Sequence, residues 1–156
     1  MLTVTLALPA VAADEQSRDA SVTVTAPETL ISITLTDPGS PGIQFGSIPP
    51  SGTVIPAEGQ SDGTPAIQVN VAIETNVQVD INIMGSTTDA LTLDNWMYSK
   101  TFVEVPFSLT SSYVPVYTDV TAGDSKPFYH WIIVPVGTTA GAYSASISYK
   151  ATTHIP

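Results

Sequence analysis

The residues of this chain best suited to chemistry are its two histidines, His130 and His154, and its scattered carboxylates. Neither histidine belongs to a His-Glu-x-x-His motif or to a paired-histidine metal spacing. The sequence also has no Gly-x-Ser-x-Gly elbow and no glycine-rich phosphate loop. We therefore expect no enzymatic activity, and we interpret His130, between Tyr129 and Trp131, as a structural imidazole at a strand edge.

Four aspartates are the best candidates for a metal site. Asp89 and Asp94 form one pair, and Asp119 and Asp124 bracket a predicted turn at residues 121–123. Oxygen ligands from loop carboxylates and carbonyls suit calcium. Both pairs are much sparser than an EF-hand loop, and solvated turn aspartates are the commoner explanation. Calcium at these residues is thus a weak prediction, and no other cofactor is expected.

Eight aromatic side chains offer either a sugar-stacking platform or a packed interior. Carbohydrate binding needs exposed, coplanar rings, whereas aromatic residues in strands usually bury large areas. We favour the packed interior. The residues are Trp96, Tyr98, Tyr113, Tyr117, Tyr129, Trp131, Tyr143 and Tyr149.

The composition excludes several function classes. The formal net charge is -10, from 14 acidic and only 4 basic residues. We therefore expect neither nucleic acid nor an anionic membrane surface as a partner, because both are bound through Lys and Arg. The absence of cysteine removes disulfides, thiol catalysis and cysteine-ligated metals.

The elements that must position these side chains are strands. Apolar and polar residues alternate in many short segments separated by Pro- and Gly-rich turns, which predicts nine or ten antiparallel strands. Residues 66–84 are either a tight hairpin or one long kinked strand, and residues 43–48 form a further short strand. Pro115 marks an edge strand or a bulge. We expect one all-β domain at residues 21–156, an antiparallel β-sandwich of the jelly-roll or Ig-like kind.

The first 13 residues have two interpretations. Small residues at 10–13 followed by charged residues are typical of the end of a signal peptide, although no basic residue precedes Arg18. The alternative is a β-strand, because Leu2, Val4, Leu6 and Leu8 alternate with polar or small residues. The run is too short for a transmembrane anchor. In the strand interpretation residues 14–20 are a polar linker, and the four apolar side chains form a donor strand that completes the sheet of another subunit.

Three segments resemble secreted prokaryotic surface proteins. They are residues 42–48 (GIQFGSI), 69–81 (VNVAIETNVQVDI) and 131–143 (WIIVPVGTTAGAY). Together they are similar to archaeal surface β-sandwiches related to the TasA/camelysin fibre proteins and the WxL cell-wall domains. The resemblance implies a secreted subunit that polymerises into extracellular filaments. The chain departs from it in lacking a sorting signal, a Trp-x-Leu pair and a metallopeptidase motif.

These observations predict a structural subunit of an extracellular filament or surface layer, assembled head to tail with copies of itself through the amino-terminal strand. We expect the protein at the cell surface, without insertion into a membrane. The alternative from a different class is a monomeric secreted adhesion or carbohydrate-binding module, calcium-dependent in one version, with surface polysaccharide as its partner.

Overall fold

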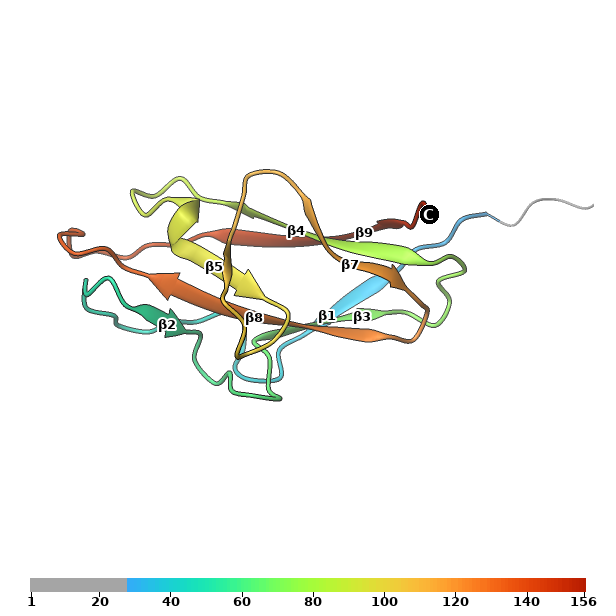
Figure 1. The fold of residues 1–156 in the computed structure, drawn as a ribbon, viewed down its shortest axis with the longest axis horizontal. Helices are drawn as coiled ribbons and strands as arrows, with labels where there is room; N and C mark the ends of the chain where they lie inside the picture. The colour runs from blue at the N-terminus through green and yellow to red at the C-terminus, as the bar shows by residue number, and fades with distance from the viewer. Residues whose placement is uncertain (1–27) are drawn as a thin grey trace, which may run out of the picture.

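The computed structural model describes residues 28–156. The predicted donor strand at residues 1–13 and the linker at residues 14–20 lie outside this range. The described chain is all-β and forms two antiparallel sheets, which confirms the predicted β-sandwich class (Figure 1). The two sheets stack with their inner faces against each other, along the long axis of the molecule.

Sheet 1 has six strands and is organised around one long central strand. Its members are β1 (Ile33–Thr36), β2 (Val54–Pro56), β3 (Ile67–Val71), β5 (Trp96–Ser99), β6 (Phe107–Ser108) and β8 (Ser125–Ile133). The order is β1-β3-β8-β5-β6, and β2 pairs with the far half of β8. β3 and β2 lie along the same edge of β8: β3 pairs with its first half and β2 with its second half.

Sheet 2 has three strands, in the order β7-β4-β9. They are β4 (Val79–Ser86), β7 (Val114–Val120) and β9 (Ser146–Thr153), and a single 3-10 turn, η1 (Leu93–Asn95), precedes β5. Pro115 lies in β7 at the edge of this sheet, beside register shifts in the β4–β7 ladder. The prediction that Pro115 marks an edge strand or a bulge is confirmed. Proline is tolerated there because an edge strand needs no backbone N–H donor on its free side.

A glutamine side chain fills the gap that β2 and β3 leave along β8. The amide of Gln60 donates to the backbone carbonyl of His130 at 2.7 Å and accepts from the His130 amide at 2.9 Å. Gln60 is 8 % exposed, so these bonds form away from solvent. The side chain therefore takes the place of a strand residue and keeps the backbone of β8 paired, as burial requires.

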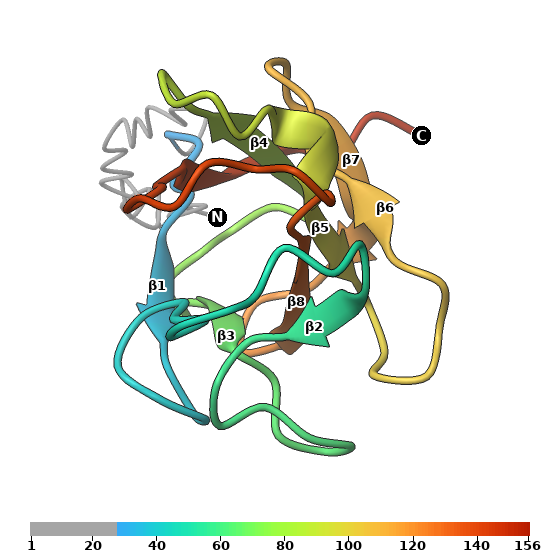
Figure 2. The ribbon, with the colours of Figure 1, turned by 90° about the vertical axis from the view of Figure 1, so that its left-hand side faces the viewer.

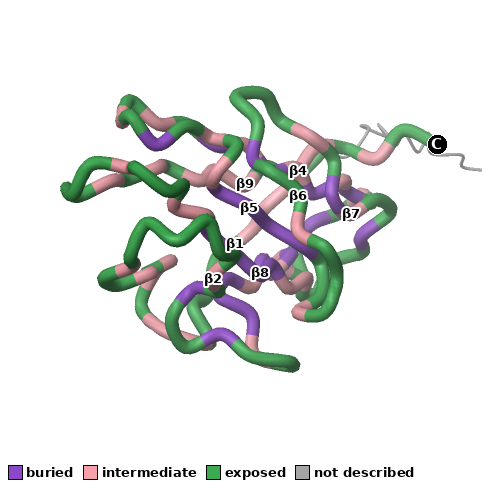
Figure 3. The backbone as a smooth tube through the Cα atoms, turned by 60° about the vertical axis from the view of Figure 1, so that its left-hand side comes forward, coloured by how far each residue is buried: buried purple, intermediate pink, exposed green. Residues whose placement is uncertain are grey.

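The core lies between the sheets and comes from the alternation in sequence. Alternate residues of β4, namely Val79, Ile81 and Ile83, have no exposed surface, and Phe128 of β8 packs opposite them. Figure 3 shows the buried segments running along β5 and β8, with exposed loops around them. A smaller cluster of Met97, Tyr129 and Trp131 lies on the outer face of sheet 1.

Two strand predictions are wrong in their pairing. Residues 66–84 form neither a hairpin nor one kinked strand, because β3 belongs to sheet 1 and β4 to sheet 2. The connection between them crosses the sandwich, held where the Thr75 hydroxyl bonds to the carbonyl of Ser32. Residues 43–48 form no strand: the chain bends there, with a left-handed backbone at Gly46, and pairs with no strand among the described residues.

One side of the sandwich is sealed by backbone hydrogen bonds to both sheets. The segment between β6 and β7 donates from the Leu109 amide to the Trp96 carbonyl of sheet 1, at 2.8 Å. Its next residue, Thr110, accepts from the amide of Gly85 in sheet 2, at 2.9 Å. Leu109 is 1 % exposed. Figure 2 shows β6 and β7 together on this side and β1 on the opposite side.

Candidate functional site

The opposite side of the sandwich, between β1 and β9, is not sealed in this way. We call it the open seam and define it by the inward-facing residues Ile33 and Leu35 of β1 and Ile147, Tyr149 and Ala151 of β9. The three β9 residues are only half-buried, and Leu35 is 50 % exposed. The apolar inner faces of both sheets therefore reach solvent along this side.

The outer edge of β9 also carries free backbone groups. Alternate residues of a strand direct their N–H and C=O groups to opposite edges. The amides of Ser144 and His154 bond toward β4, to Asp89 and to the carbonyl of Gln78. The odd-numbered residues between them, such as Ile147 and Tyr149, must then direct their backbone N–H and C=O groups away from β4. Sheet 2 has no further strand on that side in residues 28–156.

The edge of β9 lacks the usual protection against strand addition. Sheet edges are commonly blunted by proline, by bulges or by being very short. β9 contains no proline, and its ladder with β4 runs through eight residue pairs without a register shift. β1, the edge of sheet 1 that faces it, is only four residues long. β9 is therefore the longer and less protected of the two edges.

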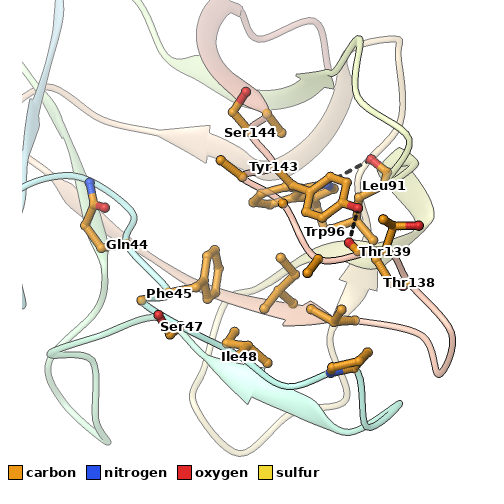
Figure 4. A pocket seen from close by; sticks show the side chains of 18 of the residues that line it. Gln44, Phe45, Ser47, Ile48, Leu91, Trp96, Thr138, Thr139, Tyr143 and Ser144 are labelled. Atoms are coloured by element: carbon orange, nitrogen blue, oxygen red, sulfur yellow. Dashed lines mark hydrogen bonds between the residues drawn. The ribbon is translucent and has the colours of Figure 1, made fainter.

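The seam ends in an uncharged pocket of about 640 Å³ beside the start of β9 (Figure 4). One wall is the irregular segment at residues 43–48, including Phe45 and Ile48, and the other is the segment that leads into β9, including Tyr143. Trp96 lies at the base, with its ring edge-on to Phe45 at 5.9 Å between centroids. The described residues that line this pocket include no Asp, Glu, Lys or Arg.

A buried histidine lies behind the seam. His130 Nε2 and the Tyr149 hydroxyl are 2.7 Å apart, and His130 is 1 % exposed. Burial lowers the pKa of His130 to about 3, although a hydrogen bond with the backbone of Met97 acts in the opposite direction and raises this pKa. Burial also raises the pKa of the Tyr149 phenol, and Asp37 adds to this shift. His130 is thus neutral at physiological pH and lies on the central strand of sheet 1, so its predicted place at a strand edge is wrong.

The other histidine connects the end of β9 to β4. His154 Nδ1 lies 2.7 Å from an oxygen of Asp80, and the same oxygen accepts from the backbone amide of Asp119. Asp119 has a left-handed backbone, with φ at 58°. These contacts hold the carboxyl-terminal end of β9 in place.

The four candidate calcium ligands separate into different contacts. Asp89 accepts from the amide and the hydroxyl of Ser144, and so fixes one wall of the pocket. Asp94 lines a shallow hollow together with Asp89. Asp124 pairs with Lys126 at 3.3 Å, and this hydrogen bond and charge lower its pKa. Within residues 28–156, no three acidic, histidine or cysteine side chains gather in a group fit to hold a metal ion.

Most of the eight aromatic rings lie in the interior. Four are buried, three are half-buried, and Tyr113 is the one that is exposed, at 41 %. The buried set is Trp96, Tyr98, Tyr129 and Trp131. These rings pack against each other and against phenylalanines, many of them edge-on or tilted. The predicted packed interior agrees with the five rings that lie in or against the main core, whereas Tyr129 and Trp131 pack with Phe102 on the outer face of sheet 1. No flat exposed platform forms among the described residues.

Comparison with known protein families, with curated proteins and with solved structures finds no match for this chain. No helix in residues 28–156 is long and apolar enough to cross a membrane. The functional argument therefore rests on the sequence and geometry of this chain.

Sequence reasoning recognised the strand that ends the chain but not its role in a site. The alternation of Tyr143, Ala145, Ile147 and Tyr149 predicts one buried face. What makes these residues a site is that β9 has no neighbour on one side, and alternation carries no information about neighbours. The signal in the sequence is the set of alternating apolar residues at positions 2–8, which predicts a donor strand but not the edge that receives it.

Proposed function

We propose that this protein is a structural subunit that assembles with copies of itself at the cell surface, by adding an amino-terminal strand to the open seam of a neighbour. The observation that carries the proposal is the seam itself: an eight-residue edge strand with free backbone groups, beside inner-face residues that are only half-buried. An edge of this kind favours pairing with another strand.

The segment that fits the seam best is the one predicted as a donor strand. Residues 2–8 carry no charge, and neither do the described residues that line the pocket at the end of the seam. Their four alternating apolar side chains match a site that needs backbone pairing on one side and apolar burial on one face. Burying one Leu or Val contributes about 1.5–3 kcal/mol, so four such residues offset much of the entropic cost of association, and the backbone hydrogen bonds to β9 add to them.

A pair of substitutions on opposite faces of residues 2–8 tests the proposal. Leu6→Asp places a charge on the face that enters the seam, whereas Thr5→Asp places the same charge on the outer face. We expect filaments in negative-stain electron micrographs of the unchanged protein and of Thr5→Asp. We expect single particles from Leu6→Asp and from a chain that begins at Asp14.

Three outcomes would contradict the proposal. If the unchanged protein remains monomeric at every concentration tested, no assembly is built into the chain. If the mature protein isolated from cells begins after residue 13, the donor strand is a signal sequence and the adhesion-module alternative takes its place. If Leu6→Asp and Thr5→Asp both form filaments, assembly does not use this strand.

A further inference from the structure

We infer that the donor strand runs antiparallel to β9 of a second copy of this chain, with Leu8 toward the pocket and Leu2 toward the end of β9. This inference rests on the proposed function and adds which strand of the seam receives the donor strand and the direction in which the donor strand runs. Two positions carry it: where the described chain begins and where the pocket opens.

The described chain begins at the end of the molecule where β9 finishes. The Asn76 side chain bonds to the carbonyl of Glu28 at 2.7 Å and to the amide of Leu30 at 2.9 Å. Asn76 lies just before β4, whose first residue, Val79, pairs with Thr153, the last residue of β9. Residue 28 is therefore close to the carboxyl-terminal end of β9, as the ribbon in Figure 1 shows.

The pocket opens at the other end of the same strand. The residues of its second wall, 138–145, lead directly into Ser146, where β9 begins. The eight residues of β9 separate the two ends by roughly 27 Å, at about 3.4 Å per residue. Residue 28 and the loop before β9, which lines the pocket, thus lie at opposite ends of the long axis, as the ribbon in Figure 1 shows. This arrangement suits head-to-tail stacking.

This placement decides the direction of the donor strand. In a head-to-tail stack the segment of one subunit leaves near the end of its β9 and enters the next subunit at the pocket. The residues closest to the body of the donor subunit, near Leu8, then lie at the pocket, and Leu2 lies farther along the seam. The strand travels from the end of β9 toward its beginning, which is the antiparallel direction.

The lengths agree with this geometry. Residues 2–8 span roughly 23 Å when extended, close to the length of β9. The 19 residues from 9 to 27 reach up to about 65 Å. They therefore connect the donor strand to residue 28 of its own subunit without tension.

Closure of one chain onto its own seam would take the reverse direction. If residues 2–8 turned back from residue 28 onto their own β9 by the direct route, Leu8 would lie near Thr153 and Leu2 near the pocket. That strand would be parallel to β9. Direction therefore separates exchange between subunits from self-closure by the direct route. Residues 9–27 are long enough to reach the pocket of their own subunit, so the cross-links must also show whether the two strands come from different chains.

Cysteine cross-linking measures the direction, and the natural chain has no cysteine to interfere. Proteins with Thr3→Cys or Ala7→Cys, on the outer face of the donor strand, are mixed pairwise with full-length partners that carry one cysteine on the outer face of β9. Outer-face neighbours on adjacent strands lie close enough for a disulfide. The partner positions are Ser146, Ser148, Lys150 and Thr152. Ser112→Cys, an exposed position on the sealed side, serves as the control.

The order of the cross-links gives the direction whatever the register. We expect Thr3→Cys to couple to a position near Thr152 and Ala7→Cys to a position near Ser146, with at least tenfold less product at Ser112→Cys. Mass spectrometry of disulfide-linked peptides identifies each pair. Formation of linked dimers from two single-cysteine proteins shows that the strand comes from a second copy.

Two results would overturn this inference while leaving strand-mediated assembly intact. The reverse order of partners would show a parallel strand. Filaments without any cross-link to β9 would show that another edge receives the strand. A chain that carries both Thr3→Cys and Thr152→Cys tests self-closure. Cross-links within that single chain, with none between single-cysteine proteins and no assembly, would overturn both this inference and the proposed function.

Discussion

Acidification should destabilise this protein through His130. The imidazole is buried on the central strand of sheet 1, and burial lowers its pKa from 6.5 to about 3. In the unfolded chain the same side chain titrates near 6.5. Between these two values the unfolded state binds a proton that the folded state excludes, so the free energy of unfolding falls as the pH falls.

The size of the effect follows from the two pKa values. Each unit of pKa difference corresponds to about 1.4 kcal/mol. Between pH 8 and pH 4 the folded state should lose roughly 3 kcal/mol from this residue alone. Since domains of this size are stable by about 5–15 kcal/mol, such a loss is easily measured.

The assay is urea unfolding followed by tryptophan fluorescence at half-unit steps from pH 8 to pH 4. The reference is His130→Asn, which is neutral throughout, while the Asp80–His154 pair remains in both proteins. We expect the variant to be less stable at pH 8, because its side chain fits the site less well. The difference should shrink by about 1.4 kcal/mol per pH unit below 6.5. A difference that stays constant down to pH 4 would refute the reasoning, since it would mean that His130 is not held neutral by burial.

Two further substitutions probe the sandwich itself. Gln60→Ala removes both of its hydrogen bonds to the backbone of His130. The His130 carbonyl keeps its bond from the Ala57 amide, but the His130 amide is left buried and unpaired, so we expect a loss of about 1–3 kcal/mol in urea unfolding. The exposed Gln44→Ala should change little, and an equal effect of the two would contradict the strand-replacing role of Gln60. Gly85→Ala would place a methyl group 3.0 Å from Leu109 on the sealed side. We expect it to cost about 1–3 kcal/mol, seen as a lower thermal midpoint, and an unchanged midpoint would show that this side is loosely packed.

The faces of the strands could be predicted from sequence more reliably than their neighbours. The alternation at residues 77–83 places Val79, Ile81 and Ile83 on one face, and all three are core residues, because period-two patterning reflects burial of one face. The same pattern in β3 and β4 did not reveal that they join different sheets. The sheet that each strand joins depends on the path of the connection between β3 and β4. That connection is held by the hydrogen bond between Thr75 and Ser32, which are 43 residues apart in sequence.

The candidate site depends on the same kind of long-range information. Tyr149 belongs to a clear alternating pattern, yet its partner His130 is on a different sheet, 19 residues earlier. Residues 43–48 alternate like a strand but line a pocket, because β2 pairs with β8 farther along the chain and no strand lies beside them. Sequence shows which side chains prefer burial, and only the assembled sandwich shows where burial is incomplete.

The direction of β9 has a mechanical consequence. β9 runs along the long axis of the molecule, so a strand added to its edge lies along that axis too. Hydrogen bonds between antiparallel strands lie perpendicular to the strands. Tension along a chain of subunits would therefore load all the bonds of the joint together in shear, instead of opening them one at a time like a zipper. An assembly joined in this way would resist pulling far better than peeling, and it would fail first where a sideways force lifts one end of a strand.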